Sequence, residues 1–500
     1  MNRYGVGLVC LLAVGAWAAQ TAKAPEATQS VTQGSVMVEG QRVDYTATAG
    51  TIVLTNQQGQ PTGSMFYVAY TRDGVKNPGE RPVTFFYNGG PGSSTIWLHM
   101  GAFGPQRIVT TDGTQTPPAP YKLVNNDYSL LDVSDEVFID MMSTGYSRII
   151  GKDQGGVGTG KDFYGIQPDV EAFAQFIEKY ISKNNRWNSP KYLYGESYGT
   201  VRSEVLANYL EQAEDINPNG VMLQSAYTGE GSFGGDKEFE TDLPTMAAAA
   251  WYHHKLANRP GQLAPFLAGV EKFAMNQYAV ALNAGNTLSS ADSHAIAQKL
   301  HDYTGVSTAY LEAHHLRMGI GEFRHQLLGD QGTTIGELDA RFTGPQMDPN
   351  SPQAEYDPQS AAISAAYVAG FNQYAHNVLK YGRDLTYRPE AYGIITGWTQ
   401  TVRNPMGRGQ GRMTPGDALA QALKFNPKLR VEVDAGYFDL NLPYYGMVYS
   451  VNHLALPQDI QGHIQFKFYG AGHMIYVNIP ALKELHDNTA AFIKSTLGGE

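Results

Sequence analysis

Cysteine is nearly absent from this sequence. The 500 residues include one cysteine, Cys10, which lies inside the first apolar run of the chain. Once that run is removed, the chain has no thiol, so thiol catalysis, thiolate metal sites and a disulfide scaffold are excluded. Stability then rests on the burial of apolar surface, which a chain of this length can supply without cross-links.

Basic clusters and long apolar runs are scarce as well. The chain has 36 Lys and Arg against 47 Asp and Glu, which gives a net charge of −11 at pH 7. An acidic chain without a basic run argues against nucleic acid and anionic membranes as partners. No stretch after the N-terminal region approaches the length of a membrane-spanning helix. The expected protein is therefore globular, with no membrane span.

The first 18 residues have the three parts of an export signal. Arg3 supplies the positive charge, residues 5–14 are apolar, and Ala16-Trp17-Ala18 has the small-x-small pattern of a cleavage site. The alternative is a buried N-terminal helix. We predict a signal peptide over residues 1–18 and a periplasmic or secreted protein, and the lack of cysteine favours the bacterial periplasm.

The order of strand and helix patterns predicts an α/β core. Residues 19–34 are rich in Ala, Thr, Gln and Ser and are expected to form a mobile lead-in. Alternating polar and apolar residues over 35–70 predict antiparallel strands. Buried strands are predicted at 81–87, 135–140, 191–194, 219–224, 429–433 and 464–469, and helices at 167–184, 200–212 and 480–496.

Residues 236–395 have a different character, with almost no strand pattern. Helical stretches are predicted there at 244–256, 262–283, 290–302, 308–328 and 359–381. Strands alternating with helices on both sides of an all-helical insertion predict an α/β fold with a mixed central sheet and a large helical cap. The core is then expected over 35–235 and 396–500.

A nucleophile pattern lies between a predicted strand and a predicted helix. Residues 195–199 are Gly-Glu-Ser-Tyr-Gly, a G-x-S-x-G pattern. In a nucleophile elbow the two glycines let strand and helix approach, and the strained turn lifts the serine hydroxyl clear of the sheet. The context predicts the α/β-hydrolase fold with Ser197 as nucleophile. The alternative is a glycine-bearing connection with a helix-capping serine.

Such a nucleophile is followed, further along the chain, by an acid and then a histidine. His473 stands in a glycine loop after a late predicted strand, from which it can take the proton of Ser197 and return it to the leaving group. Asp439 is one candidate to hold the imidazole ring. Asp434, which lies nearer to the end of the preceding strand, is its rival.

A glycine-rich loop, Asn-Gly-Gly-Pro-Gly-Ser-Ser at 88–94, follows an early predicted strand directly. In α/β-hydrolases a loop at this place supplies one N–H group of the oxyanion hole, and the residue after the nucleophile supplies the other. The predicted donors are therefore the N–H groups of Gly90 and Tyr198. The alternative is a plain turn.

Several segments together resemble the serine carboxypeptidase family. They follow the family's order and are FFYNGGPGSS (85–94), GAFGP (101–105), VFIDMMSTGYS (137–147), GESYG (195–199), AGYFDLNLPYYG (435–446) and GAGHM (470–474). The resemblance covers about 35–235 and 425–475, and the insertion has no matching motif. It implies Ser197, Asp439 and His473 as a catalytic triad that needs no metal and no organic cofactor.

The resemblance also implies a site for the free C-terminal carboxylate of a peptide. In the family the residues that match Asn88 and Glu196 bind this carboxylate, and Gly89, next to Asn88 in the glycine loop, is expected to bind substrate with them. Glu196 would need a proton in order to donate a hydrogen bond to the carboxylate instead of repelling it. The family match therefore implies activity at acidic pH.

Three departures from the family pattern affect these expectations. Ser93 stands where the family usually has a cysteine, and Phe86 stands where it has a tryptophan. Ala102 stands where a second glutamate is expected to pair with the one beside the serine. The loss of this glutamate weakens both the carboxylate site and the expected acidic optimum. The chain thus resembles a cysteine-free, bacterial-type member of the family.

These observations predict a serine-type carboxypeptidase that releases C-terminal residues from peptides through an acyl-enzyme on Ser197. One alternative is the same triad in an aminopeptidase of the proline-iminopeptidase type, or in an esterase or acyltransferase. Another is an inert binding protein on the same fold. Glu196 favours the carboxypeptidase and Ala102 weighs against it. The sequence carries no signal for an oligomeric state.

Overall fold

The computed structural model describes residues 26–227, 234–405 and 413–498. The predicted signal peptide, 1–18, and Cys10 lie outside the described residues. No helix in the described part of the chain is long and apolar enough to cross a membrane.

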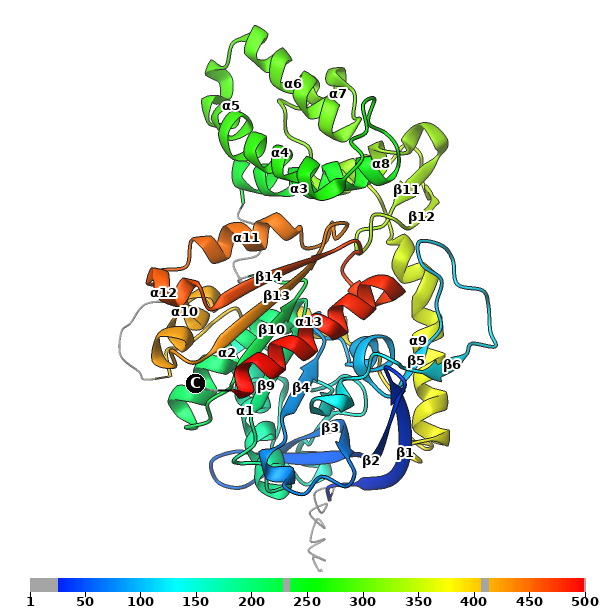
Figure 1. Cartoon of the computed structure of the whole chain (residues 1–500), viewed down its shortest axis with the longest axis vertical. Coiled ribbons are helices and arrows are strands. Elements are labelled where there is room, and N and C mark those ends of the chain that lie inside the picture. Colours follow the sequence, from blue (N-terminus) through cyan, green and yellow to red (C-terminus); the bar gives the residue numbers. More distant parts are fainter. Residues whose placement is uncertain (1–25, 228–233, 406–412, 499–500) are drawn as a thin grey trace, which may run out of the picture.

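A ten-stranded mixed sheet forms the centre of the molecule (Figure 1). Its order is β1-β2-β3-β7-β4-β9-β10-β13-β14, and β8 pairs with β3. Strands β7, β4, β9, β10, β13 and β14 run parallel, whereas β1, β2 and β3 are antiparallel. The strands are β1 (Gln29–Val38), β2 (Gln41–Thr55), β3 (Pro61–Arg72), β4 (Val83–Tyr87), β7 (Asp135–Ile139), β8 (Arg148–Ile149), β9 (Lys191–Glu196), β10 (Gly220–Gln224), β13 (Arg430–Gly436) and β14 (Ile464–Tyr469).

The first strand begins earlier than predicted. The expectation of a mobile lead-in over 19–34 is wrong from Gln29 onward, because β1 pairs in antiparallel register with β2, with Gln29 opposite Gly50. The Ser30 hydroxyl donates to the carbonyl oxygen of Leu379 at 2.7 Å. Polar side chains are compatible with this position because β1 is the edge strand of the sheet and keeps one face largely in solvent.

Helices cover both faces of the sheet. One face packs against α1 (Ile166–Lys183), α2 (Tyr198–Ala213) and α10 (Pro415–Phe425), and the other against α9 (Pro358–Asn377) and α13 (Ile479–Leu497). Successive residues of a strand alternate between the faces. Phe85 of β4 therefore packs with the first group of helices and Phe86 with the second. Burying one such side chain stabilises the fold by about 1.5–3 kcal/mol.

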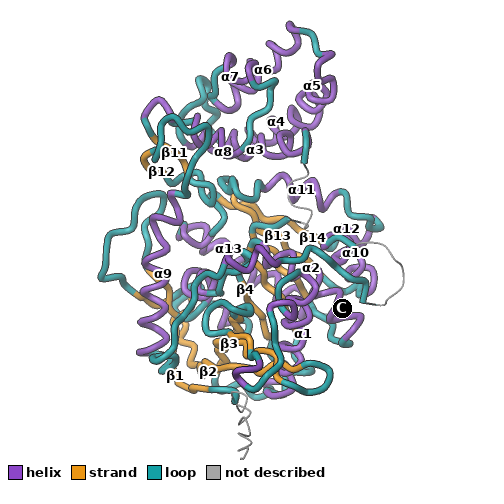
Figure 2. The backbone as a smooth tube through the Cα atoms, turned by 180° about the vertical axis from the view of Figure 1, so that it is seen from behind, coloured by secondary structure: helices purple, strands orange, loops and turns teal. Residues whose placement is uncertain are grey.

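A helical cap lies at one end of the molecule, as both views show (Figures 1 and 2). Its buried side chains form a separate apolar cluster. The cap consists of α3 (Asp236–Tyr252), α4 (Leu263–Phe273), α5 (Ala279–Ala284), α6 (Ser290–Thr304), α7 (Thr308–Ala313), α8 (Ile320–Gln326) and the hairpin of β11 (Thr333–Ile335) and β12 (Thr343–Pro345). The hairpin had no counterpart in the sequence prediction.

Packing divides the predicted insertion, 236–395, between two bodies. Within this range the buried side chains of the cap cluster end at Ala340, whereas Ile363 and Phe371 of α9 belong to the core of the main sheet. The prediction of a single helix over 308–328 is wrong, because α7 and α8 are two separate helices there. His315 and Leu316 have φ values of 52° and 67°, in the left-handed region, and this break separates α7 from α8. The break lets Leu316 turn into the cap core, where it is buried.

Candidate active site

The predicted site residues lie in loops at the carboxyl ends of neighbouring parallel strands. Asn88 follows β4, Ser197 follows β9, Asp439 follows β13, and His473 follows β14. These strands lie close to one another in the sheet, with β10 between β9 and β13. The carboxyl edge of a parallel sheet is where open α/β folds place their ligands, because the loops there converge.

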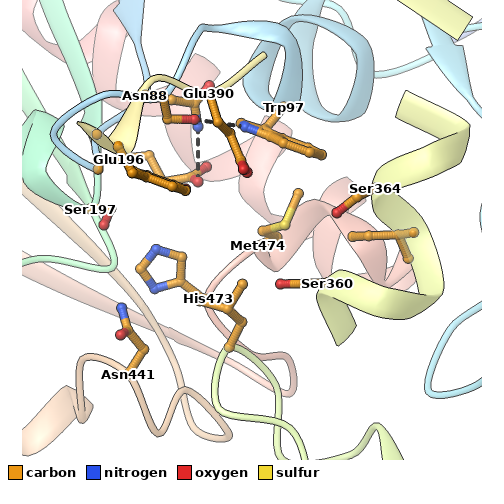
Figure 3. A pocket seen from close by; sticks show the side chains of 16 residues that line it. Asn88, Trp97, Glu196, Ser197, Ser360, Ser364, Glu390, Asn441, His473 and Met474 are labelled. Carbon is orange, nitrogen blue, oxygen red and sulfur yellow. Dashed lines mark hydrogen bonds between the residues drawn. The ribbon is translucent and has the colours of Figure 1, made fainter. Parts of the chain in front are cut away.

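Ser197 has the strained backbone of a nucleophile elbow. Its φ is 61° and its ψ is −130°, a conformation that a side chain rarely adopts. A Cβ atom at Gly195 would overlap the carbonyl oxygen of Gly199. Glycine is therefore needed where β9 passes the start of α2. The turn leaves Ser197 on the wall of a pocket that His473 also lines (Figure 3).

His473 is paired with Asp439. The imidazole Nδ1 lies 2.8 Å from Oδ2 of Asp439, and because a carboxylate only accepts, Nδ1 carries the proton. The other carboxylate oxygen accepts the backbone N–H groups of Asn441 and Leu442, at 3.0 and 2.9 Å. Burial on its own would lower the pKa of His473, but the charge and hydrogen bond of Asp439 outweigh this and raise it.

Asp434, the rival acid, lies elsewhere. It is fully buried within β13, and its carboxylate accepts a hydrogen bond of 2.6 Å from the Tyr469 hydroxyl. Burial raises the pKa of Asp434 to about 7. The structure therefore brings Asp439 to the imidazole and leaves Asp434 inside the sheet.

The glycine loop after β4 packs against the elbow. A Cβ atom at Gly89 would overlap the backbone nitrogen of Tyr198, so only glycine allows this approach. Gly90 has a φ of 107°, which again favours glycine. Tyr198 is the first residue of α2, so its N–H group has no partner within the helix. Gly90 and Ser197 line the same pocket.

Glu196 is held by two amide side chains. Asn88 Nδ2 donates to one carboxylate oxygen at 2.9 Å, and Gln224 Nε2 donates to the other at 3.1 Å. The orientation of Asn88 is fixed because its own oxygen accepts the N–H group of Leu98 at 3.1 Å. Burial raises the pKa of Glu196 to about 7, although the positive charge of His473 opposes the shift. Glu196 therefore changes charge near neutral pH.

Ala102 supplies no carboxyl group at the position where the family pattern has a second glutamate. Its side chain is fully buried, and its carbonyl oxygen accepts a hydrogen bond of 2.7 Å from Asn126. A side chain at the preceding Gly101 would overlap the hydroxyl region of Tyr367 and the ring of Tyr476. The two tyrosines fill the space beside this segment.

The pocket beside Ser197 is lined by the core, by Leu338 of the cap hairpin, and by α9 and the segment after it (Figure 3). Its walls are formed by Asn88, Gly89, Gly90, Ser93, Trp97, Glu196, Ser197, Leu338, Ser360, Ile363, Ser364, Glu390, Tyr392, Asn441, His473 and Met474. In the described part of the chain, no lysine or arginine is among them. The Glu390 side chain points into the pocket, and its pKa is raised by partial burial. The pocket therefore has acidic character.

Sequence reasoning missed Gln224, Glu390 and the cap residue Leu338. Gln224 ends the strand next to the nucleophile strand, and this position in a predicted parallel sheet was the available signal. It also donates to the carbonyl oxygen of His473 at 3.1 Å, which links two loops of the site. Glu390 and Leu338 are brought in from distant segments that carry no motif.

Comparison with known proteins gives one family and several partial relatives. The serine carboxypeptidase family matches residues 39–309, more than half of the chain. Over 169 residues the chain is 33% identical to carboxypeptidase Y homolog A of Phaeosphaeria nodorum, which covers 34% of this chain and 27% of that protein. Over 179 residues it is 27% identical to serine carboxypeptidase-like 5 of Arabidopsis thaliana, covering 33% and 36%. The matched segment is thus 27% of the length of the first relative and 36% of the length of the second.

A solved structure shows the same fold over most of its length. Kex1(delta)p, a prohormone-processing carboxypeptidase from Saccharomyces cerevisiae, superposes with a TM-score of 0.54 at 15% identity, covering 90% of this chain and 91% of that chain. Identity at this level supports the fold and nothing finer. Together with the mixed sheet, it confirms the predicted α/β-hydrolase fold.

Proposed function

Because the chain belongs to the serine carboxypeptidase family, we propose that it hydrolyses the C-terminal peptide bond of peptides with Ser197 as nucleophile. One observation carries the proposal. A buried glutamate with a pKa near 7, held by Asn88, lies next to the serine at the wall of the pocket. This arrangement suits a substrate that ends in a free carboxylate.

The proposed first step is acylation. Ser197 Oγ attacks the scissile carbonyl carbon while the Nε2 atom of His473 takes the hydroxyl proton. Asp439 holds the ring through Nδ1 and stabilises the imidazolium that forms. The negative oxygen of the tetrahedral intermediate accepts the N–H groups of Gly90 and Tyr198. When the C–N bond breaks, the leaving amine takes the proton from His473, and the acyl-enzyme remains.

The second step is hydrolysis of the acyl-enzyme. A water molecule gives a proton to His473 and attacks the ester carbonyl carbon through the same kind of intermediate. The C–O bond to Ser197 then breaks, and the serine recovers its proton from the imidazolium. The shortened peptide leaves with a new carboxylate, and no oxidant, metal or cofactor enters the balance.

Recognition of the C-terminal carboxylate is assigned to Asn88, Gly89 and Glu196. No lysine or arginine lines the described pocket, so the substrate carboxylate must be bound by neutral donors. Protonated Glu196 can donate a hydrogen bond, whereas ionised Glu196 would repel the substrate. Since the pKa of Glu196 is near 7, carboxylate binding is expected to weaken above neutral pH. Amide donors replace the second carboxyl group that Ala102 lacks.

Glu390 adds a charge preference to this proposal. Its carboxylate points into the pocket without a lysine or arginine among the lining residues. We therefore expect cationic substrate groups to be preferred over acidic ones. The same carboxylate favours a second candidate function, aminopeptidase action, because it suits a free α-ammonium group as well as a basic side chain.

Export is a further part of the proposal. The pattern of Arg3, the apolar run 5–14 and Ala16-Trp17-Ala18 supports a signal peptide and a periplasmic or secreted, cysteine-free, bacterial-type enzyme. Intact-mass measurement of protein purified from an exporting host should show a chain that begins after Ala18. Retention of residues 1–18 in the exported protein would contradict this.

The test of the main proposal compares three substrates from pH 4 to 8. These are an N-blocked dipeptide, its C-terminal amide and the same dipeptide with a free amine. The first should be cleaved, the second should be cleaved at least tenfold more slowly, and Ser197→Ala should abolish both reactions. Cleavage that requires the free amine would establish the aminopeptidase instead. Turnover of simple esters only would favour an esterase.

A further inference from the structure

The loop of the cap hairpin reaches the two catalytic loops directly. Residues 336–342 join β11 to β12, and we name them the hairpin loop. On the acid side, Leu440 N–H donates to Glu337 O at 2.9 Å, and Ala340 N–H donates to Phe438 O at 2.9 Å. The two bonds are made by Phe438 and Leu440, the residues on either side of Asp439. The backbone of the hairpin loop therefore fixes the position of the catalytic acid.

The hairpin loop also holds the loop of the catalytic histidine. His473 N–H donates to the carbonyl oxygen of Leu338 at 2.6 Å, and Gly472 N–H donates to the Asp339 carboxylate at 3.2 Å. A Cβ atom at Gly472 would overlap the Asp339 Cβ atom and the Leu338 carbonyl oxygen. Glycine is therefore required for this close approach, which a loose lid resting on the core would not need.

Asp339 is the centre of these contacts. It has no exposed surface, and its carboxylate accepts the Nε and Nη2 groups of Arg341 at 2.9 and 2.6 Å. Arg341 Nη2 also pairs at 2.9 Å with the exposed side chain of Asp112, outside the cap. A buried, bidentate ion pair of this kind has a fixed geometry. The Asp339 carboxylate can therefore transmit that geometry to Gly472.

The hairpin loop is itself anchored on both sides. His253, directly after α3, donates from Nε2 to Ala340 O at 2.6 Å, and Asp357 at the start of α9 accepts the N–H group of Glu337 at 2.7 Å. On the opposite side, Phe438 and Leu440 of the acid loop are buried in the apolar cluster of the cap. The catalytic acid loop is thus part of the cap core.

We propose that Asp339 is a positioning residue for the catalytic histidine and acid, and that the cap hairpin holds these two residues in register with Ser197. The inference rests on the proposed function only in taking Ser197 and His473 as the reacting pair. A displacement of the order of 1 Å in such a pair costs about a hundredfold in rate. The cap then positions the catalytic residues in addition to forming part of the pocket wall.

The electrostatic surroundings of His473 provide a readout specific to positioning. Three carboxylates raise the pKa of the His473 imidazole: Asp439 from the loop after β13, Glu196 from β9 and Asp357 from the start of α9. The contact with Asp439 raises the pKa of His473 against the opposing effect of burial. If the hairpin loop no longer fixes the two catalytic loops, this contact weakens and the pKa of His473 should fall.

The test uses Asp339→Asn in the full-length enzyme. The amide can accept at only one of the two oxygen positions. With its NH2 group at the Oδ2 position the bonds from Gly472 N–H and Arg341 Nη2 are lost, and with the NH2 group at the Oδ1 position those from Arg341 N–H and Nε are lost, so either orientation breaks the bidentate pair. The rate at which a fluorophosphonate labels Ser197 is measured from pH 5 to 9, because labelling needs the serine and histidine but no peptide specificity. We expect a rate about a hundredfold lower, with its acid limb moved to lower pH.

Asp135→Asn is the matched control. Asp135 is a buried carboxylate paired at 2.7 Å with both Arg81 and Arg186, at the start of β7 and therefore at the opposite edge of the sheet. The Asp135→Asn variant, like Asp339→Asn, removes one negative charge from a buried ion pair with arginine. Its thermal midpoint should fall, while its labelling rate and acid limb stay at the parent values. This separates positioning from a general loss of stability.

The outcomes divide clearly. A folded Asp339→Asn variant with the parent's labelling rate and pH profile would overturn the inference, as would equal losses in Asp339→Asn and Asp135→Asn. Absence of labelling in the parent enzyme would instead refute the proposed function. If Asp339→Asn does not fold, Arg341→Lys is used, which keeps the charge but loses the bidentate fork. Its labelling rate should fall by about tenfold without a matching loss in the control, and an unchanged rate would overturn the inference.

Discussion

The carboxyl edge of the sheet and the helical cap contribute to one site in different ways. The sheet edge supplies Ser197, the glycine loop and Glu196 from short segments in which backbone geometry requires particular residue types. The cap supplies Leu338 and Asp339 through a hairpin whose sequence carries no motif. Site residues that lie in locally strained turns can be predicted from the sequence, because the strain requires particular residue types. Residues that position the site through tertiary packing cannot be predicted in this way.

The largest expected effect concerns the sheet edge alone. Ser197→Ala should lower kcat by about a millionfold on the N-blocked dipeptide, because the acyl-enzyme can no longer form. The side chain is small and lies on a pocket wall, so the thermal midpoint should stay near that of the parent. Steady-state assays and thermal unfolding check both parts. Residual turnover within a few-fold of the parent would move the nucleophile elsewhere.

A second comparison concerns two aspartates close together in the sequence, Asp434 within β13 and Asp439 in the loop after it. Asp439→Asn should lower kcat by about ten-thousandfold, because the amide favours the wrong imidazole tautomer. Asp434→Asn should leave kcat near the parent value, since Asp434 bonds to Tyr469. Equal losses in the two variants, measured under the same conditions, would contradict the assignment.

The Asp434 variant should also change how stability depends on pH. Burial raises the pKa of Asp434 in the folded protein to about 7, above its unfolded value near 3.9. The unfolded state therefore binds fewer protons between about pH 4 and 7, and this residue makes the fold less stable as the pH rises. In Asp434→Asn the decrease in the free energy of unfolding between pH 5 and 8 should be smaller. Denaturant unfolding at the two pH values measures it.

A smaller effect is expected for carboxylate recognition. In the parent, KM for the free-acid dipeptide should rise by up to about tenfold per pH unit above pH 7, as Glu196 loses its proton. Glu196→Gln should flatten this rise, because an amide donates at every pH. KM for the C-terminal amide of the same dipeptide serves as the control and should change little with pH. Parallel pH profiles for the acid and the amide would remove Glu196 from carboxylate binding.

The smallest expected effect is on charge selectivity. Glu390→Gln should lower kcat/KM for dipeptides with a lysine or arginine side chain by about two- to fivefold, because the carboxylate is partly exposed and its attraction is screened. Neutral dipeptides should be affected less, and acidic ones should improve. An unchanged ratio of basic to neutral substrates would show that Glu390 does not contact the side chain.

Much of the fold follows from the sequence for a physical reason. Strands β4 and β7 are buried on both faces and are short segments dominated by Val, Ile and Phe, so their existence and order are predictable. The start of β1 was missed because an edge strand can be polar. The break after α7 was missed because Leu316 adopts a left-handed conformation to bury its side chain in the cap. Nothing in the sequence of 308–328 indicates that Leu316 must be buried in this way.

The site divides in the same way. Gly89, Gly195 and Gly199 lie where two backbone segments approach closely, and these glycines allowed the nucleophile region to be predicted from the sequence. The choice between Asp439 and Asp434 needed the family resemblance, because both follow the strand that the sequence predicts at 429–433, whereas β13 extends to Gly436 and contains Asp434. Gln224 and Glu390 depend on which strands and loops become neighbours, and that information lies in the packing.

The central claim is that Ser197 is activated by His473 to attack a carbonyl carbon. Mass spectrometry of the enzyme after treatment with a fluorophosphonate tests it most directly, with the adduct located by proteolytic mapping. One adduct per chain on the peptide that contains Ser197, absent in His473→Ala, is the predicted result. An adduct on another residue, or equally rapid labelling of Ser197 in His473→Ala, would contradict the account.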